Sequence, residues 1–156
     1  MFNEIYNFLK ISDNLYTSGM PTVDQLREAS GEGVEVIINL APNDVPEAIA
    51  GEEGMVNSMG LDYVHIPVRW STPTRQGLDI FMEAMDQRKD KKVWIHCEAN
   101  FRATAFVTLY RILRQGWAEE DAFKAMHDIW DEDSYPVWKS FIDANLQESR
   151  QDAKKT

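Results

Sequence analysis

Cysteine and basic residues are scarce in this sequence. Its 156 residues include one cysteine, so no disulfide can form within the chain. The 16 lysines and arginines are outnumbered by 26 aspartates and glutamates, which gives a formal net charge of -10 at pH 7. Nonspecific nucleic-acid binding depends on Lys and Arg neutralising phosphates, so this charge argues against nucleic acid or an anionic membrane surface as a partner. A small phosphorylated ligand remains compatible, because a site can be locally positive in an acidic protein.

Long apolar runs are missing as well. No stretch approaches the ~18 apolar residues of a membrane span. The first residues, MFNEIYNFLKISDN, have neither the basic start nor the apolar core of a signal peptide. The single cysteine and the absence of a signal-peptide pattern predict a cytoplasmic protein. A chain whose leader had been removed would look the same, so a periplasmic location is the alternative. The three histidines are scattered and form no metal-ligand spacing with the cysteine, so we expect no metal and no cofactor.

The length and apolar content are those of one folded domain. The chain falls within the ~100–200 residues typical of a domain, and 44% of its residues are hydrophobic. We assign the domain to residues 1–146. Residues 147–156, QESRQDAKKT, are polar and predict a frayed C-terminal tail. The sequence does not indicate an oligomeric state.

Segments typical of strands and of helices alternate along the chain. Residues 34–40, VEVIINL, and 91–97, KKVWIHC, are the runs expected of central strands covered on both faces. Two further strands are predicted at 13–18 and 62–68. Predicted helices fill the intervals: a short one opened by a capping box of Thr22 and Gln25, a weaker one ending at Gly60, and others within 72–89, 102–116, 118–130 and 135–146.

This alternation predicts an α/β domain in three layers. We expect a four- to five-stranded, mainly parallel sheet with helices on both faces. In such sheets ligands lie at the carboxyl ends of the strands. Cys97 lies at the carboxyl end of a strand that its apolar character places centrally, so the sole thiol falls where a ligand would bind.

The segment HCEANFRAT, residues 96–104, contains the side chains that are candidates for catalysis and anion binding. A short loop from a strand into a helix converges its backbone N–H groups on one point, and the helix N-terminus adds partial positive charge there. A thiolate at Cys97 is stabilised by this arrangement and should be nucleophilic near neutral pH. Arg102 offers a planar fork for two oxygens of a phosphate or sulfate. Thr104 can donate its hydroxyl hydrogen to the sulfur, and His96 should hold the loop by hydrogen bonding.

The segment VWIHCEANFRAT resembles the signature H-C-x-x-G-x-x-R-[ST] of cysteine-dependent protein tyrosine and dual-specificity phosphatases. Upstream, LYTSGMPTVDQL, GVEVIINLAPND and YVHIPV resemble segments of small bacterial phosphatase-like domains related to beta-lactamase-hydrolase-type proteins. The resemblance covers about residues 12–130. It implies a phosphatase-like fold, hydrolysis of phosphomonoesters through a phosphocysteine at Cys97, and a phosphorylated small molecule or phosphoprotein as substrate.

The loop departs from that signature in length and in one residue. Four residues separate the cysteine from the arginine where the signature has five: Glu98, Ala99, Asn100 and Phe101. A four-residue loop also occurs in rhodanese-like sulfurtransferases, whose cysteine carries a persulfide, so this activity is an alternative. Asn100 replaces the loop glycine and tolerates the positive φ that the turn needs. The resemblance implies a phosphate-binding loop of residues 98–102, with the Glu98 side chain pointing away.

The general acid of the resembled phosphatases has no obvious counterpart. Their loop after the strand matching YVHIPV carries an aspartate, and this chain has Trp70 about there, within RWSTPT. Asp44 and Asp79 are weak substitutes. Arg69 and Trp70 could line the mouth of the site instead. Since loss of a general acid typically lowers the rate ~10²–10⁴-fold, an inactive pseudophosphatase that binds phosphorylated ligands is a third hypothesis.

Overall fold

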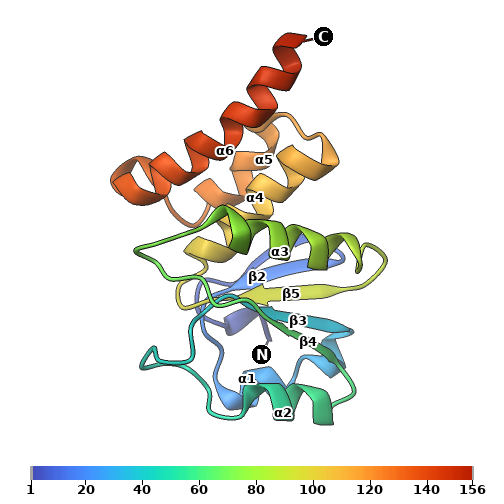
Figure 1. Cartoon of the computed structure of the whole chain (residues 1–156). Helices are drawn as coiled ribbons and strands as arrows, with labels where there is room; N and C mark the ends of the chain where they lie inside the picture. Colours follow the sequence, from blue (N-terminus) through green and yellow to red (C-terminus); the bar gives the residue numbers. More distant parts are fainter. Residues whose placement is uncertain (1, 156) are drawn as a thin grey trace.

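A five-stranded sheet forms the middle of the molecule in the computed structural model, which describes residues 2–155 (Figure 1). The strands lie in the order β1-β2-β5-β3-β4. They span Leu9–Ser12 (β1), Leu15–Ser18 (β2), Val36–Asn39 (β3), Asp62–His65 (β4) and Val93–His96 (β5). All neighbours are parallel except β1 and β2, which are antiparallel. This confirms the mainly parallel sheet predicted from the sequence, with β5 at its centre.

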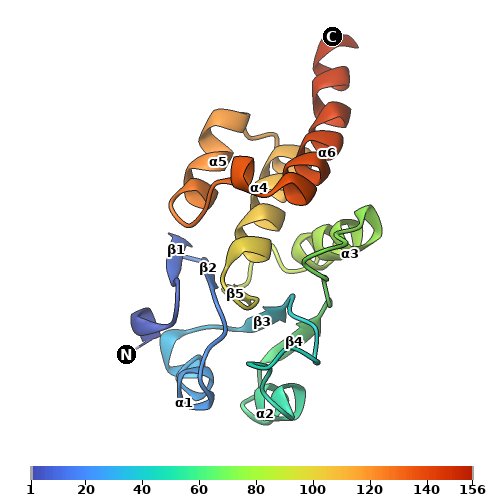
Figure 2. The same ribbon diagram turned by 90° about the vertical axis from the view of Figure 1, so that its left-hand side faces the viewer.

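Helices cover both faces of the sheet. In Figure 1 α1 and α2 lie below the sheet and α3 to α6 above it. Figure 2 shows α5 and α6 packed on the outer side of α4, so the upper layer is two helices deep. The α-helices span Val23–Arg27 (α1), Glu52–Ser58 (α2), Arg75–Asp86 (α3), Phe101–Gln115 (α4), Glu119–His127 (α5) and Pro136–Lys155 (α6). Short 3-10 turns occur at Phe2–Glu4, Ser30–Glu32 and Glu132–Ser134.

Both faces of the central strands are buried, which explains their unbroken apolar runs. Along β3, Val36 and Ile38 pack into the core beneath α3 and α4, while Ile37 packs into a second core with Trp94 and Leu26. Alternate side chains of a strand point to opposite faces, so each core takes every second residue. A strand covered in this way needs apolar residues at every position.

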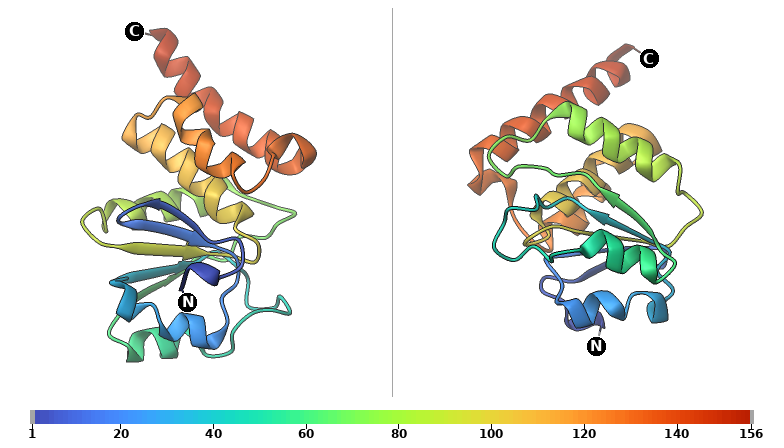
Figure 3. Two further views of the ribbon diagram at one scale, coloured as in Figure 1. Left: turned by 180° about the vertical axis from the view of Figure 1, so that it is seen from behind. Right: turned by 60° about the horizontal axis from the view of Figure 1, so that its bottom comes forward.

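The N-terminal strand β1 was not predicted from the sequence. Its burial alternates between intermediate and exposed, so LKIS carries little apolar signal. The strand forms through its hairpin with β2 at one edge of the sheet, seen from behind in Figure 3. Backbone pairing, rather than side-chain burial, is what defines it.

The last helix is longer than the predicted helix within 135–146. Residues 147–155 continue α6, where the sequence predicts a frayed tail. Two surface ion pairs involve the first of these residues: the Arg75 guanidinium contacts Glu148 at 2.6 Å, and Arg150 contacts Glu119 at 2.9 Å. The polar composition of this segment gives no sign of the extension, because these ion pairs join residues that are far apart in the chain. Met1 and Thr156 lie outside the described residues.

Among residues 2–155, no helix combines the length and the apolar character that crossing a membrane would require.

Replacing Ile37 by Ala should lower the free energy of unfolding by about 2–5 kcal/mol, because it leaves a cavity in the core. Ile37 is fully buried. Ile80, which is 50% exposed on α3, provides a matched control. Ile80→Ala should change stability by less than about 0.5 kcal/mol. Urea unfolding of both variants measures the difference, and equal losses would contradict the assignment of Ile37 to the core.

Candidate active site

The chain turns sharply between β5 and α4, and Asn100 makes the turn. Asn100 has a φ of 69°, in the left-handed region that asparagine tolerates better than most residues. Its side chain is fully buried, and its Nδ2 donates to the backbone oxygen of Asn7 at 2.8 Å and to Thr17 Oγ1 at 3.0 Å. The asparagine therefore supplies the backbone conformation and also ties the loop to the N-terminal hairpin.

A second tie holds the loop against the end of β2. The backbone N–H of Met20 donates to the backbone oxygen of Glu98 at 2.9 Å, and Gly19 forms a β-bridge with Ala99. A Cβ on Gly19 would lie 2.7 Å from that same Glu98 oxygen. Only glycine permits so close an approach of the two backbones.

Cys97 and Arg102 line one cavity. The cavity has a volume of about 320 Å³, and the other residues around it are Trp70, Glu98, Ala99, Phe101 and Tyr135. Cys97 directly follows β5 and Arg102 lies in the first turn of α4, so strand, loop and helix together bring the two residues to the same cavity. Both are buried, with Arg102 only 5% exposed.

Arg102 is held from two sides. Its Nη1 donates to the Val68 backbone oxygen at 2.7 Å, and its Nη2 donates to Glu98 Oε1 at 2.6 Å. The Glu98 side chain therefore turns toward the arginine, which corrects the expectation that it points away. The cause is charge: a buried guanidinium without a counter-charge is costly, and Glu98 lies one helical turn away.

His96 and Thr104 support other parts of the fold than the sequence predicts. His96 is fully buried and its Nε2 lies 2.8 Å from Glu52 Oε2 on α2, so it joins β5 to that helix rather than holding the loop. The Thr104 hydroxyl donates to the Asn100 backbone oxygen at 2.7 Å and accepts from Trp130 Nε1 at 3.0 Å. The Thr104 hydroxyl hydrogen is therefore directed to Asn100 and not to the Cys97 sulfur, where the sequence predicts it.

Aromatic side chains form the far wall of the cavity. Trp70 lines the cavity and stacks on Trp138, with ring centroids 5.2 Å apart. The indole Nε1 of Trp138 donates to the Trp70 backbone oxygen at 2.7 Å. Tyr135 was missed, because no sequence motif marks the segment before α6. The pair Tyr135 and Trp138, three residues apart at the start of that helix, is the only sequence signal that could have indicated it.

The predicted acids and Arg69 are not part of this cavity. Arg69 is exposed and its Nη1 contacts Asp44 at 2.8 Å; this hydrogen bond holds the pKa of Asp44 below its ordinary value. Asp79 contacts Arg75 at 2.7 Å on α3. An ionised, paired carboxylate is a poor proton donor. Among the described residues, Glu98 is the only carboxyl group lining the cavity.

The arrangement suits a tetrahedral oxyanion placed against a thiol. The first turn of α4 has N–H groups without intrahelical partners and carries the positive end of the helix dipole. The Arg102 guanidinium adds a full positive charge, although its Nη1 donates to Val68 and its Nη2 to Glu98 in this structure. A thiol at the end of a central strand, next to such a loop on an α/β sheet, is the arrangement expected of cysteine-dependent phosphatases and of rhodanese-like sulfurtransferases.

Comparison with known proteins gives the family. Residues 12–116 match the family model described as "Polymorphic toxin system, DSP-PTPase phosphatase". The chain therefore belongs to this family of dual-specificity and protein tyrosine phosphatases. No protein with curated annotation matches it.

Solved structures agree with the family match. A protein of the DUF442 group from Shewanella putrefaciens CN-32, named as a phosphatase, is 34% identical, with 92% of this chain and 91% of that chain covered and a TM-score of 0.83. Tk-PTP is 18% identical over 100% of both chains, with a TM-score of 0.75. A Cys-to-Ser variant of P. aeruginosa TpbA in complex with pTyr is 17% identical over 92% and 90% of the chains, with a TM-score of 0.68. The last two share the fold.

Replacing Glu98 by Gln should strengthen binding of inorganic vanadate by about tenfold, because it removes the negative charge that competes for Arg102. Isothermal titration calorimetry measures the dissociation constant. Glu120→Gln makes the same charge change on the exposed surface of α5 and should leave binding unchanged. Weaker binding by Glu98→Gln would show that the carboxylate helps to hold the anion.

Proposed function

We propose that this protein hydrolyses phosphomonoesters through a phosphocysteine intermediate at Cys97. One observation carries the proposal: Cys97 and Arg102 line the same cavity at the carboxyl end of the central strand. The family match supports phosphatase chemistry in general. No metal and no cofactor enters the proposed reaction.

The reaction proceeds in two displacements. The Cys97 thiolate attacks phosphorus, the sulfur–phosphorus bond forms, and the ester oxygen leaves with the bonding electron pair and takes up a proton. Arg102 and the loop N–H groups hold the three equatorial oxygens as charge develops on them. Water then attacks phosphorus, the sulfur–phosphorus bond breaks, and inorganic phosphate and the thiolate are released. For the substrate to bind, Glu98 must give up its contact with Nη2 of Arg102.

The walls of the cavity favour a phosphate ester with a flat apolar group. Trp70, Phe101 and Tyr135 surround the space beside the thiol. Aromatic walls of this kind pack well against a phenyl ring. The pTyr bound in the TpbA variant supports a phosphorylated substrate for this chain, either a phosphoprotein or a phosphorylated small molecule. The sulfurtransferase and pseudophosphatase hypotheses are not favoured by the family match.

Cys97→Ser should abolish release of 4-nitrophenol from 4-nitrophenyl phosphate, since a hydroxyl is a far weaker nucleophile than a thiolate at neutral pH. Acid quenching of the wild-type enzyme during turnover should trap phosphate on Cys97, detected by peptide mass spectrometry. Equal release by both proteins would refute the assignment. A sulfur adduct on Cys97 after thiosulfate, without phosphatase activity, would support the sulfurtransferase hypothesis.

The rate of the first displacement should depend strongly on the leaving group, because neither Asp44 nor Asp79 lines the cavity. We expect 4-nitrophenyl phosphate to react roughly 10²-fold or more faster than phenyl phosphate, within the range that general acid catalysis can supply. Burst-phase kinetics isolate this step. Similar rates for the two esters would mean that the enzyme does protonate the leaving oxygen, and Glu98→Gln, Asp44→Asn and Asp79→Asn would then locate the acid.

A further inference from the structure

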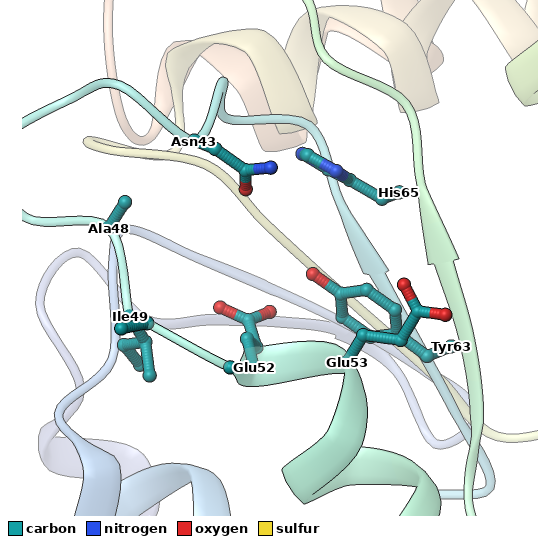
Figure 4. Close-up of a pocket in the computed structure, with 9 residues that line it drawn as sticks. Asn43, Ala48, Ile49, Glu52, Glu53, Tyr63 and His65 are labelled. Carbon is teal, nitrogen blue, oxygen red and sulfur yellow. The ribbon is translucent and has the colours of Figure 1, made fainter.

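A second cavity adjoins the cavity at Cys97. It has a volume of about 480 Å³, and we call it the Tyr6 cavity; the residues that line it include Tyr6, Met20, Pro21, Glu47, Glu98 and Ala99. Glu98 and Ala99 line both cavities, so the two spaces are neighbours. The cavity beside α2 that Figure 4 shows has no lining residue in common with the cavity at Cys97. The Tyr6 cavity can therefore take the part of a substrate that lies beyond its phosphorylated group.

The turn that carries Tyr6 is bonded to the cysteine loop. The Asn7 side chain donates from Nδ2 to the Ala99 backbone oxygen at 3.0 Å, and Asn100 Nδ2 donates to the Asn7 backbone oxygen at 2.8 Å. The backbone N–H of Gly19 donates to the Tyr6 oxygen at 2.7 Å. Asn7 has a φ of 50°, in the left-handed region that asparagine tolerates better than most residues. These bonds fix the position of Tyr6 relative to the loop.

Tyr6 is held in place and yet remains 59% exposed. Its ring lies against Gly19, where an added Cβ would be 2.7 Å from Tyr6 Cδ2 and 2.7 Å from the Glu98 backbone oxygen. Gly19 thus separates the tyrosine from the cysteine loop by the thickness of one backbone. Because the hydrophobic contribution to stability scales with the area removed from water, a ring this exposed adds little to the core. Its fixed place beside the loop indicates a contact with something outside the chain.

The charged residues that line the Tyr6 cavity are both acidic, Glu47 and Glu98. Among the described residues, no cation pairs with the exposed Glu47 carboxylate. Glu98 lies 2.6 Å from Nη2 of Arg102, and the proposed function requires a phosphate to displace it. The displaced carboxylate then needs a new counter-charge. A positive group of the substrate in the Tyr6 cavity would supply one, whereas a second phosphate or an acidic side chain would be repelled.

We propose that the Tyr6 cavity is a specificity subsite for a substrate side chain that has an alkyl stem and a positive end. This proposal rests on the proposed phosphatase function. The stem packs against Met20 and Pro21, as the stems of lysine and arginine do on apolar surface. The positive end lies beside the Tyr6 ring, whose face attracts cations, and the Glu47 carboxylate. A lysine or arginine next to a phosphotyrosine in a polypeptide has this chemistry, and a multiply phosphorylated small molecule does not.

Hydrolysis of three peptides of the form acetyl-Ala-X-pTyr-X-Ala-amide tests the proposal, with X as lysine, norleucine or glutamate. Norleucine keeps the stem of lysine without its charge. We expect kcat/KM for the lysine peptide to exceed that for the norleucine peptide roughly threefold, since exposed ion pairs are weak. It should exceed that for the glutamate peptide at least tenfold, because like charges repel as well. Equal values for the three peptides, or a preference for glutamate, would overturn the proposal.

Variants locate the subsite through the ratio of kcat/KM for the lysine peptide to that for the glutamate peptide. A ratio measured on one variant cancels losses of folded protein and changes in the chemical step. Tyr6→Ala and Glu47→Gln should each lower this ratio at least threefold, while Tyr6→Phe, which keeps the ring, should retain it. Glu120→Gln removes the same charge from exposed surface of α5 and should also retain it. Equal effects of Glu47→Gln and Glu120→Gln would assign the preference to the acidic protein as a whole and overturn the subsite.

Calorimetry with the Cys97→Ser variant separates the subsite from the proposed reaction, because it measures peptide binding without turnover. Tighter binding of the lysine peptide than of the glutamate peptide would support the subsite even if the wild-type protein hydrolysed neither peptide nor 4-nitrophenyl phosphate, a result that refutes the proposed function alone. Hydrolysis of all three peptides without discrimination would refute the subsite alone. Failure of every peptide to bind would refute the subsite as well.

Discussion

The turn from β5 into α4 depends on the side chain and the backbone of Asn100 together. A glycine there would adopt the same positive φ, but it would make no bond to Asn7 or Thr17. The asparagine therefore fixes the loop relative to the first hairpin, and the position of everything after it follows. Arg102 lies two residues further on, so its approach to Cys97 is set by this turn. Gly19 completes the constraint from the other side, by allowing the chain after β2 to touch the loop.

A buried arginine needs acceptors and a counter-charge, and the Glu98 carboxylate supplies both to Arg102. A guanidinium that is 5% exposed needs acceptors even when no ligand is bound. Nη1 of Arg102 donates to the Val68 backbone oxygen, and Nη2 donates to the Glu98 carboxylate. A carboxylate is a planar anion with two oxygens, so it occupies the nitrogen that a phosphate would use. Any anion that binds to Arg102, as the proposed function requires, would therefore have to displace the Glu98 carboxylate.

The central elements could be predicted from the sequence because their signals are local. The apolar runs of β3 and β5 and the capping box of Thr22 and Gln25 can be identified in neighbouring residues, and the structure contains all of them. The placing of Cys97 at a strand end follows from the same periodicity. What could not be predicted depends on residues far apart in the chain. The Thr104 hydroxyl accepts a hydrogen bond from Trp130, Glu148 and Arg150 pair with Arg75 and Glu119, and β1 exists through its pairing with β2.

The aromatic wall of the cavity has a consequence for relatives of this protein. The family match ends at residue 116, yet Tyr135 and Trp138 belong to the helical segment that follows it. Cys97 and the loop after it thus lie in one part of the chain, and part of the aromatic wall of the cavity lies in another. Substitutions in the helices after residue 116 would change which substrates fit the cavity, while the residues of the cysteine loop stay the same.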